Sequence, residues 1–323
     1  MSKIINWGIL GPGKIAKKFA LGLSYVPNAN LYAAASRSLE KAKDFSVEMG
    51  ADKAYGSYTE MLNDPKVDAV YIATPHVFHY EHTLLCLKHK KPVLCEKPFA
   101  MNKDQVKEMI DFAQKQDTFL MEAMWTHFLP HFKYTKEVIK SGKYGKVLAM
   151  EADFGFDAPF NANSRIYNKA LGGGSLLDIG IYPIFAALSF LGKPEKIEAT
   201  AKMTKTEVDA RCHATFFYPE NVKAELYSFV DKHTDVAATI KLEKAEIYIK
   251  PRFHQPSSVV ITTENDSFTK EFGVKANGYN FEAEHVGQML LEGKKESTEM
   301  SFDKSLELIE MLDKVREKIG LEY

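Results

Sequence analysis

The turn Gly11-Pro12-Gly13-Lys14-Ile15-Ala16 limits the folds open to this chain more than any other stretch. It follows an apolar segment, residues 4–10, that predicts a strand, and it opens a predicted helix over residues 14–23. A G-x-G-x-x-G/A pattern between a strand and a helix permits a tight turn and brings backbone N–H groups and a helix N-terminus close to a pyrophosphate. The candidate dinucleotide-binding residues of this turn are Gly11, Gly13, Lys14 and Ile15.

The segment after the second predicted strand, residues 31–35, indicates which dinucleotide binds. NAD enzymes place an acidic residue roughly 20 residues after the glycines, where it binds the ribose hydroxyl. Here the chain has Ser36-Arg37-Ser38, with Lys41 one turn further on. A guanidinium and hydroxyls hold a 2′-phosphate, which a carboxylate would repel. The alternative is that Arg37 is a solvated loop residue. We predict NADP as the cofactor, with NAD as the second choice.

Strands and helices continue to alternate through the first part of the chain. Further strands are predicted at residues 67–73, 92–95 and 118–122, and cap-like pairs at residues 57–60 and 102–105 open the helices between them. Such repetition predicts a doubly wound parallel sheet of the Rossmann type, whose ligand lies beyond the carboxyl ends of the strands. Polar residues fall at these ends, namely Thr74, Glu96 and Lys97.

The second part of the chain has a different pattern. An extended segment at residues 146–154 and a helical stretch precede several runs dense in β-forming residues. These runs are residues 196–205, 210–218, 222–230, 236–242, 245–249, 259–263 and 268–272. Successive strands without helices predict a large, open, mainly antiparallel sheet with helices on one face. We therefore predict a Rossmann domain over residues 1–123 and an α+β substrate and dimerisation domain over residues 124–323, with its last helix packing back toward the first domain.

A glycine triplet, residues 172–174, leads into an apolar segment that carries Asp178 and Tyr182. In a helix, residues four apart lie on one face, so both side chains would face the same space. Glycines also leave room for a flat ligand close to the backbone. The simpler alternative is a glycine-rich turn before a buried helix. Pro183 disfavours helical geometry at Tyr182 unless a helix restarts with the proline at its first position.

Composition excludes several classes of partner. A net charge of −1 argues against a nucleic-acid or membrane-surface partner. No apolar run was expected to reach the roughly 18 residues of a membrane span, and Met1-Ser2-Lys3 does not resemble a signal peptide. Three cysteines, odd in number and without metal-like spacing, indicate a reduced, cytoplasmic protein.

The histidines are not expected to form a metal site. His79, His82 and His89 lie on or beside one predicted helix, and His127 and His131 are four residues apart. A pair at this spacing can bind zinc, but neither an H-E-x-x-H pattern nor a third ligand accompanies it. We predict no metal.

Several segments together resemble one enzyme family. These are Gly11–Ala16, Ala73-Thr74-Pro75, Val93–Pro98 and Gly172–Pro183, in the order typical of the glucose–fructose oxidoreductase / inositol 2-dehydrogenase (Gfo/Idh/MocA) family. Met121–Thr126 adds a closer likeness to its dimeric dihydrodiol dehydrogenase branch. The resemblance covers essentially the whole chain. It implies a nicotinamide-dependent oxidoreductase in which the open sheet packs on a second subunit, so we expect a homodimer.

The resemblance also implies residue roles. Lys97 would touch the nicotinamide ribose and the reacting oxygen, Asp178 would orient the substrate or the lysine, and Tyr182 would be the acid/base. The predicted cofactor-binding set, beyond the first turn, is Ser36, Arg37, Ser38, Lys41, Thr74, Pro75, His79, Glu96, Lys97 and Trp125. His127 stands where the branch usually has arginine, and His76 where asparagine is common.

The chemistry of hydride transfer requires a base near the substrate hydroxyl. A phenol titrates near pH 10, and a cation such as Lys97 favours the phenolate and stabilises a developing alkoxide. We predict a dehydrogenase acting on a small molecule: a sugar, polyol or cyclic diol. Trp125, Phe154 and Tyr279 would line its pocket, with core packing as their alternative role. A non-catalytic NAD(P)-binding regulator and a redox-neutral, NAD-dependent glycosidase remain the competing functions.

Overall fold

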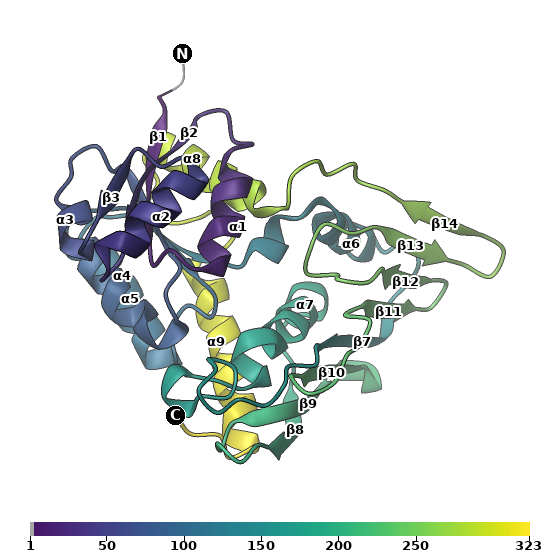
Figure 1. The fold of residues 1–323 in the computed structure, drawn as a ribbon. Coiled ribbons are helices and arrows are strands. Elements are labelled where there is room, and N and C mark those ends of the chain that lie inside the picture. The colour runs from purple at the N-terminus through teal and green to yellow at the C-terminus, as the bar shows by residue number, and fades with distance from the viewer. Residues whose placement is uncertain (1–2) are drawn as a thin grey trace. The chain divides into compact units, whose positions relative to one another are not determined.

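The computed structural model describes residues 3–323, whose contacts divide the chain into two compact units. The first comprises residues 3–125 and Lys275–Leu306, and the second comprises Thr126–Val274 and Glu307–Tyr323. Met1 and Ser2, part of the polar start considered above, lie outside the described residues. Each unit is built on its own sheet (Figure 1).

The first unit contains a six-stranded parallel sheet in the order β3-β2-β1-β4-β5-β6. This is the order of a doubly wound dinucleotide-binding sheet. The strands are β1 (Ile5–Leu10), β2 (Ala29–Ala35), β3 (Lys53–Tyr55), β4 (Ala69–Ile72), β5 (Val93–Glu96) and β6 (Leu120–Ala123). Strands β4, β5 and the edge strand β6 are buried along their whole length, and their sequences are mainly apolar apart from Glu96 in β5 and Glu122 in β6.

The helices of this unit are α1 (Lys14–Leu23), α2 (Leu39–Met49), α3 (Tyr58–Leu62), α4 (His79–Lys88), α5 (Lys103–Lys115) and α8 (Tyr279–Leu291), with a 3₁₀ turn at His76–Phe78. Side chains of Ser38, Ser57 and Asn102 accept a backbone N–H at the starts of α2, α3 and α5. The late helix α8 packs on α1, where a Cβ on Gly22 would lie 2.7 Å from that of Tyr279. A glycine at position 22 therefore allows the two helices to approach closely.

The second unit contains an eight-stranded sheet in the order β14-β13-β12-β11-β7-β10-β9-β8 (Figure 1). The strands are β7 (Val147–Gly155), β8 (Lys196–Met203), β9 (Asp209–Phe217), β10 (Lys223–Phe229), β11 (Ala238–Leu242), β12 (Glu246–Ile249), β13 (Val259–Thr262) and β14 (Ser267–Lys270). β7 and β10 pair in parallel, and the other pairs are antiparallel. The predicted fold class is confirmed.

The helices of the second unit are α6 (Pro130–Lys140), α7 (Ile181–Leu191) and most of α9 (Phe302–Lys318), and a 3₁₀ turn, Trp125–Phe128, precedes α6. Further 3₁₀ turns lie at Lys169–Leu171 and Pro219–Asn221. α7 packs on β7 and β10. Residues of β9 and β10 alternate between buried and half-buried, so one face of the sheet lies on the core and the other is partly open.

Helical geometry continues through Pro183. A π-helical turn, Leu176–Gly180, runs directly into α7, and the backbone N–H of Ile181 bonds the carbonyl of Leu176. Pro183 is the third residue of α7, and its missing N–H leaves one hydrogen bond of this continuous helical run unmade. The helix does not restart at the proline, as one sequence-based alternative required.

The apolar segment around α7 is longer than expected from sequence. The run Lys169–Leu191 has 23 residues, and an 18-residue window within it has a mean hydropathy of 1.6, which is long and apolar enough to cross a membrane by length and composition alone. The expectation that no run reached this length is therefore corrected. Because 78% of the most apolar window is buried inside the structure, the run has the character of a core helix.

Candidate active site

The first glycine of the N-terminal turn is required by two features of the backbone. Gly11 has a φ of 91°, and a Cβ there would lie 2.6 Å from Cγ2 of Thr74. The first turn can therefore lie directly beside the end of β4. Gly13 caps α1 without a side-chain hydrogen bond, and the first turn of α1 carries no acidic residue. Its N–H groups suit an anionic ligand, so the turn fits a dinucleotide pyrophosphate.

Ser36, Arg37, Ser38 and Lys41 lie together at the carboxyl end of β2. Ser36 Oγ accepts the backbone N–H of Ser38 at 3.2 Å, and Ser38 Oγ accepts that of Lys41 at 3.4 Å. Arg37 and Lys41 are exposed. The hydroxyls thus shape the turn, while a guanidinium and an ammonium are available to solvent. This donor set fits a 2′-phosphate.

His79 ties together two loops at the carboxyl edge of the sheet. Its Nδ1 lies 2.8 Å from the carbonyl oxygen of Pro98, and its Nε2 lies 2.8 Å from that of Thr74. Both partners are acceptors, so the ring donates a hydrogen bond through whichever nitrogen carries its hydrogen. Buried His79 therefore fixes the Thr74-Pro75 loop to the loop that carries Lys97.

Two buried carboxyl groups hold the segment around Lys97. Glu96 accepts the hydroxyl of Tyr71 and, at 3.2 Å, the backbone N–H of Lys97. Glu122 accepts the backbone N–H of Phe99 at 3.0 Å, and burial raises its pKa to about 7. The Lys97-Pro98 peptide is cis. The described contacts of Glu96 are thus internal to the protein, and its predicted contact with the cofactor stays a prediction.

Trp125 and Tyr279, both predicted to line the substrate pocket, meet in the first unit. Their rings stack with centroids 4.2 Å apart and planes 11° apart. Trp125 is buried by this contact, and Tyr279 begins α8. The two residues are 154 positions apart in sequence, so the stack depends on α8 packing beside α1.

In the second unit, the glycine triplet is filled by the protein itself. A Cβ on Gly173 would lie 2.6 Å from the carbonyl oxygen of Ile166, and Gly174, with a φ of 114°, has no room for one beside the Asp209 carboxylate. The space beside these glycines is occupied by other parts of the chain. We had expected that space to admit a flat ligand.

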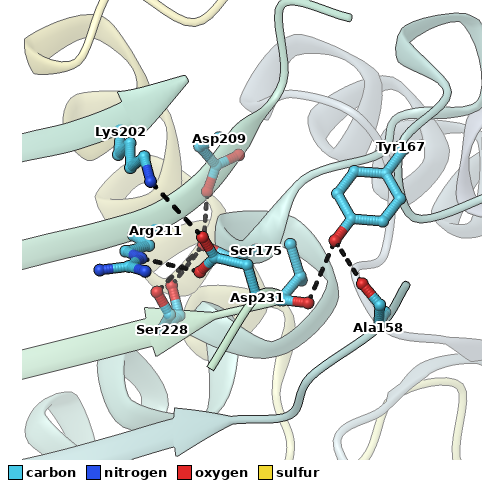
Figure 2. Close-up of polar contacts among 9 residues, drawn as sticks. Ala158, Tyr167, Ser175, Lys202, Asp209, Arg211, Ser228 and Asp231 are labelled. Carbon is cyan, nitrogen blue, oxygen red and sulfur yellow. Dashed lines mark hydrogen bonds and ion pairs between the residues drawn. The ribbon is translucent and has the colours of Figure 1, made fainter. Parts of the chain in front are cut away.

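A buried network follows the triplet (Figure 2). Oδ2 of Asp209 accepts the hydroxyl of Ser175 at 2.6 Å and the backbone N–H of Leu176 at 2.7 Å. The hydroxyls of Ser175 and Ser228 are 2.8 Å apart. Burial raises the pKa of Asp209 to about 6 despite these hydrogen bonds. The network fixes the backbone just before the turn that carries Asp178.

Asp178 pairs with Arg165, which the sequence analysis did not identify. Nη2 of Arg165 lies 2.9 Å from each carboxylate oxygen of Asp178. Arg165 is a single arginine in an irregular segment, so no periodicity marks it; its only signal was its position shortly before the glycine triplet. Lys97 belongs to the first unit and Asp178 to the second, and the predicted role of Asp178 in orienting the lysine stays a prediction.

Tyr182 lies in an aromatic cluster with Phe154 and His254. Its ring centroid is 5.5 Å from that of Phe154 and 5.0 Å from that of His254, and the latter two are 4.3 Å apart. Phe154 was predicted to line the substrate pocket. His254 was not predicted, because it lies in no recognisable sequence motif. Tyr182 is 6% exposed, so its environment is largely apolar.

The histidines at the start of the second unit are buried. Nε2 of His131 contacts the carbonyl oxygen of Phe253 at 2.7 Å, and burial lowers the pKa of His131 to about 4. The ring of His127 packs edge-on against Phe185. Across residues 3–323, no group of three or more histidine, cysteine or acidic side chains is arranged to hold a metal ion.

The Rossmann sheet, its phosphate-binding turn and the donors after β2 define the class of this protein: an NAD(P)-dependent oxidoreductase. The family model described as the oxidoreductase family with an NAD-binding Rossmann fold matches residues 5–124, and the GFO/IDH/MocA C-terminal domain matches residues 132–248. The chain belongs to the Gfo/Idh/MocA family. The predicted family, cofactor class and enzyme class, an NAD(P)-dependent dehydrogenase or reductase, are confirmed.

Curated relatives match over the full chain. The trans-1,2-dihydrobenzene-1,2-diol dehydrogenase of Xenopus laevis is 36% identical over 98% of this chain and 99% of its own, and that of Homo sapiens is 33% identical over 99% and 98%. A 3-ketoreductase from Actinomadura kijaniata, solved with NADP and TDP-benzene, is 26% identical, with a TM-score of 0.88 and 98% of both chains covered. An aldose-aldose oxidoreductase from Caulobacter crescentus shares the fold, with a TM-score of 0.89 at 23% identity and 98% of both chains covered.

Proposed function

We propose that this protein is an NADP-dependent dehydrogenase that transfers a hydride between nicotinamide C4 and a carbinol or carbonyl carbon of a sugar, polyol or cyclic diol. Tyr182 is the acid/base, Lys97 the electrostatic helper, and Asp178 the residue that orients the substrate. The names of the relatives, a dihydrobenzenediol dehydrogenase and a 3-ketoreductase, support a carbinol or carbonyl substrate. Trp125, Phe154 and Tyr279 supply the apolar wall for the substrate ring.

The observation that carries the proposal is the way the chain holds Lys97. The ring of His79 and the carboxyls of Glu96 and Glu122 fix the backbone of residues 96–99 at the carboxyl end of β5. Gly11 and Thr74 lie at the same edge of the sheet, which is where a dinucleotide binds in this architecture. A lysine whose backbone is held in this way at the edge of the sheet suits the stabilisation of a developing alkoxide.

In the direction of oxidation, the substrate loses a hydride from carbon and a proton from its hydroxyl oxygen, and a carbonyl forms. The acceptor for this hydride is the chemistry that NADP would supply when bound. Tyr182 takes the proton, and the ammonium of Lys97 stabilises the negative charge that develops on the oxygen. The aromatic cluster around Tyr182 excludes water from the phenol. Reduction follows the same steps in reverse.

The test is turnover of sugars, polyols and dihydrodiols, followed at the reduced-nicotinamide absorbance band. We expect Tyr182→Phe and Lys97→Met each to lower kcat by about 100-fold or more, the range of one acid/base or electrostatic group. NADP affinity, measured by fluorescence, should change little in Tyr182→Phe. Matched controls are Tyr25→Phe and Lys88→Met, because both side chains are exposed.

Two results would contradict the proposal in different ways. Near-normal turnover in both variants would contradict the roles assigned to Tyr182 and Lys97. Normal NADP binding by the wild-type protein without turnover of any substrate would favour a non-catalytic regulator. Glycoside cleavage without net change in the reduced-nicotinamide band would identify the redox-neutral glycosidase.

The proposal includes a homodimer formed through the partly open face of the second sheet. His213, Tyr227 and Phe229 form a row of stacked rings there, with centroids 4.4 and 6.2 Å apart. A row of half-buried aromatics on one sheet face is typical of an interface core. Light scattering should show a dimer, and Tyr227→Arg should yield monomers; a monomeric wild-type protein would contradict this part.

The proposal also assigns nucleotide binding to residues 1–123 and substrate binding and dimerisation to residues 124–323. It places the protein in the cytoplasm, because Cys86, Cys95 and Cys212 are free and buried, which suits a reducing compartment. Cell fractionation tests the location, and recovery in a secreted fraction would overturn it. Nucleic acid and membranes are not proposed as partners.

A further inference from the structure

The pair formed by Arg165 and Asp178 leaves part of the arginine unused. Nη2 of Arg165 contacts both oxygens of Asp178 at 2.9 Å, and the pairing raises the pKa of Arg165. Among residues 3–323, Nε and Nη1 of Arg165 have no hydrogen-bond partner, and the arginine side chain is 40% exposed. The guanidinium therefore keeps hydrogen-bond donors for a further oxygen beside the carboxylate.

The glycine triplet is what brings Arg165 to Asp178. The carbonyl oxygen of Arg165 lies 2.8 Å from the position of a Cβ on Gly173, so a larger residue there would displace the arginine backbone. The backbone N–H of Gly174 donates to the carbonyl of Ile166 at 2.8 Å. These contacts align the segment that carries Arg165 along the triplet that leads to Asp178.

The neighbours of Arg165 in sequence anchor it further. Ile166 and Tyr167 pack in one cluster with Ile179, the residue directly after Asp178. The Tyr167 hydroxyl donates to the carbonyls of Ala158 and Val230 at 2.8 and 3.2 Å (Figure 2). Both partners of the ion pair are thus held by the same buried cluster, which fixes their geometry before a ligand binds.

We propose that Arg165 is a substrate-binding residue, which positions Asp178 and donates a hydrogen bond to the substrate oxygen next to the reacting carbon. This rests on the proposed function and extends it. A carboxylate and a guanidinium side by side complement two neighbouring oxygens, one donating to Asp178 and the other accepting from Arg165. Arg165 thereby favours substrates that carry an oxygen beside the reacting carbinol.

The first experiment compares a good substrate with its analogue that lacks the neighbouring hydroxyl, for a sugar the 2-deoxy sugar. Arg165→Met should lower kcat/KM for the hydroxylated substrate by about 10- to 100-fold, the range of one charge-assisted hydrogen bond. The kcat/KM for the deoxy analogue should fall much less, so the ratio of kcat/KM between the two substrates should approach one. NADP affinity should be unchanged.

Lys169→Gln is the matched control, because it removes a cation four residues away whose partner is the exposed Glu207. An effect of Arg165→Met no larger than that of the control, with the substrate preference intact, would overturn the inference. If Arg165→Met does not fold, Arg165→Lys provides the same comparison, since it keeps the charge but not the planar fork. An unchanged substrate preference in that variant would equally overturn the inference.

Two further measurements separate substrate contact from support of Asp178. Guanidinium chloride, well below denaturing concentrations, should restore activity to Arg165→Ala but not to Lys97→Met; failure to restore it counts against a direct role. In an Asp178→Asn background, Arg165→Met should lower kcat/KM further, and no further loss would overturn the substrate contact. Wild-type protein without turnover of any substrate would overturn the proposed function and this inference together, whereas an active enzyme indifferent to Arg165 would overturn the inference alone.

Discussion

The hydroxyl of Ser175 donates to Asp209 at 2.6 Å, and this hydrogen bond joins the end of the glycine triplet to the start of β9. The same carboxylate oxygen accepts the backbone N–H of Leu176, the first residue of the π-helical turn. The turn that presents Asp178, and the helix that presents Tyr182, therefore begin from a point fixed by a buried acid. The stability of the candidate site depends on this acid.

The ionisation of Asp209 should make the protein less stable as the pH rises from about 4 to about 6. Burial raises the pKa of Asp209 to about 6, above its value in an unfolded chain, so the folded state holds the proton more tightly. The unfolding free energy is therefore highest below both pKa values and falls by about 3 kcal/mol once the pH exceeds both. Denaturant titrations at several pH values should show this fall.

Asp209→Asn should make the fall shallower and leave the part that comes from buried Glu122, whose pKa is also raised, because an amide oxygen still accepts from Ser175 and Leu176 but does not ionise. Asp44→Asn, at an exposed site, is the control and should keep the wild-type slope. The same slope in all three proteins would show that Asp209 does not titrate in this range.

Gly174→Ala should destabilise the protein by about 2–4 kcal/mol, or prevent folding. Its φ of 114° suits glycine, and an added methyl group would collide with the Asp209 carboxylate. Gly142→Ala is the matched control: its φ is also positive, at 66°, but nothing lies within 4 Å of its added Cβ. Calorimetry on both variants measures the difference, and equal losses would mean that the collision is relieved without cost.

Arg37→Ala should weaken NADP binding by about 10- to 100-fold and change NAD binding by less than about twofold. The reason is that the exposed guanidinium beside Ser36 and Ser38 is the donor that best fits a 2′-phosphate, which NAD lacks. Fluorescence titration with both nucleotides measures this, with Lys43→Ala, also exposed on α2, as the control. A parallel loss for both nucleotides would exclude a specific phosphate contact.

Tyr323→Phe should lower the unfolding free energy by about 1 kcal/mol, the net contribution of one hydrogen bond. The Tyr323 hydroxyl donates to the carbonyl of Gly173 at 2.6 Å, and the Arg316 guanidinium lies 5.9 Å from the ring centroid. Burial raises the pKa of Tyr323, so the hydroxyl remains a donor at neutral pH. Tyr25→Phe, at a tyrosine that is 59% exposed, should have no effect on thermal unfolding, and an equal shift in both would contradict the assignment.

Sequence patterns predicted most of the first unit. The strand–turn–helix pattern at the N-terminus predicted a helix over residues 14–23, and α1 has these bounds. Ser57 and Asn102 cap helices as predicted. These features depend on local geometry and on buried strands with mainly apolar sequence, both of which leave a signal in neighbouring residues. β3 was missed because three half-exposed residues carry no such pattern.

Contacts between distant residues could not be predicted in the same way. Arg165, His254 and Asp209 belong to irregular segments or strand ends, and only folding brings them to Asp178, Tyr182 and Ser175. The glycine triplet shows the difference well. Its sequence predicted space beside the backbone, and the structure fills that space with the carbonyl of Ile166 and the carboxylate of Asp209.

The sequence by itself determined the class of fold, because strand and helix patterns follow from local spacing and residue chemistry; the cofactor-binding turn and the candidate reactive side chains it supplied as predictions. The tertiary structure alone decided which groups hold those side chains: His79 between two carbonyls, Arg165 on Asp178, and α8 packed on α1. The physical reason is that such contacts join residues remote in sequence, and their free energy arises from burial and hydrogen bonding that exist only once the chain has folded.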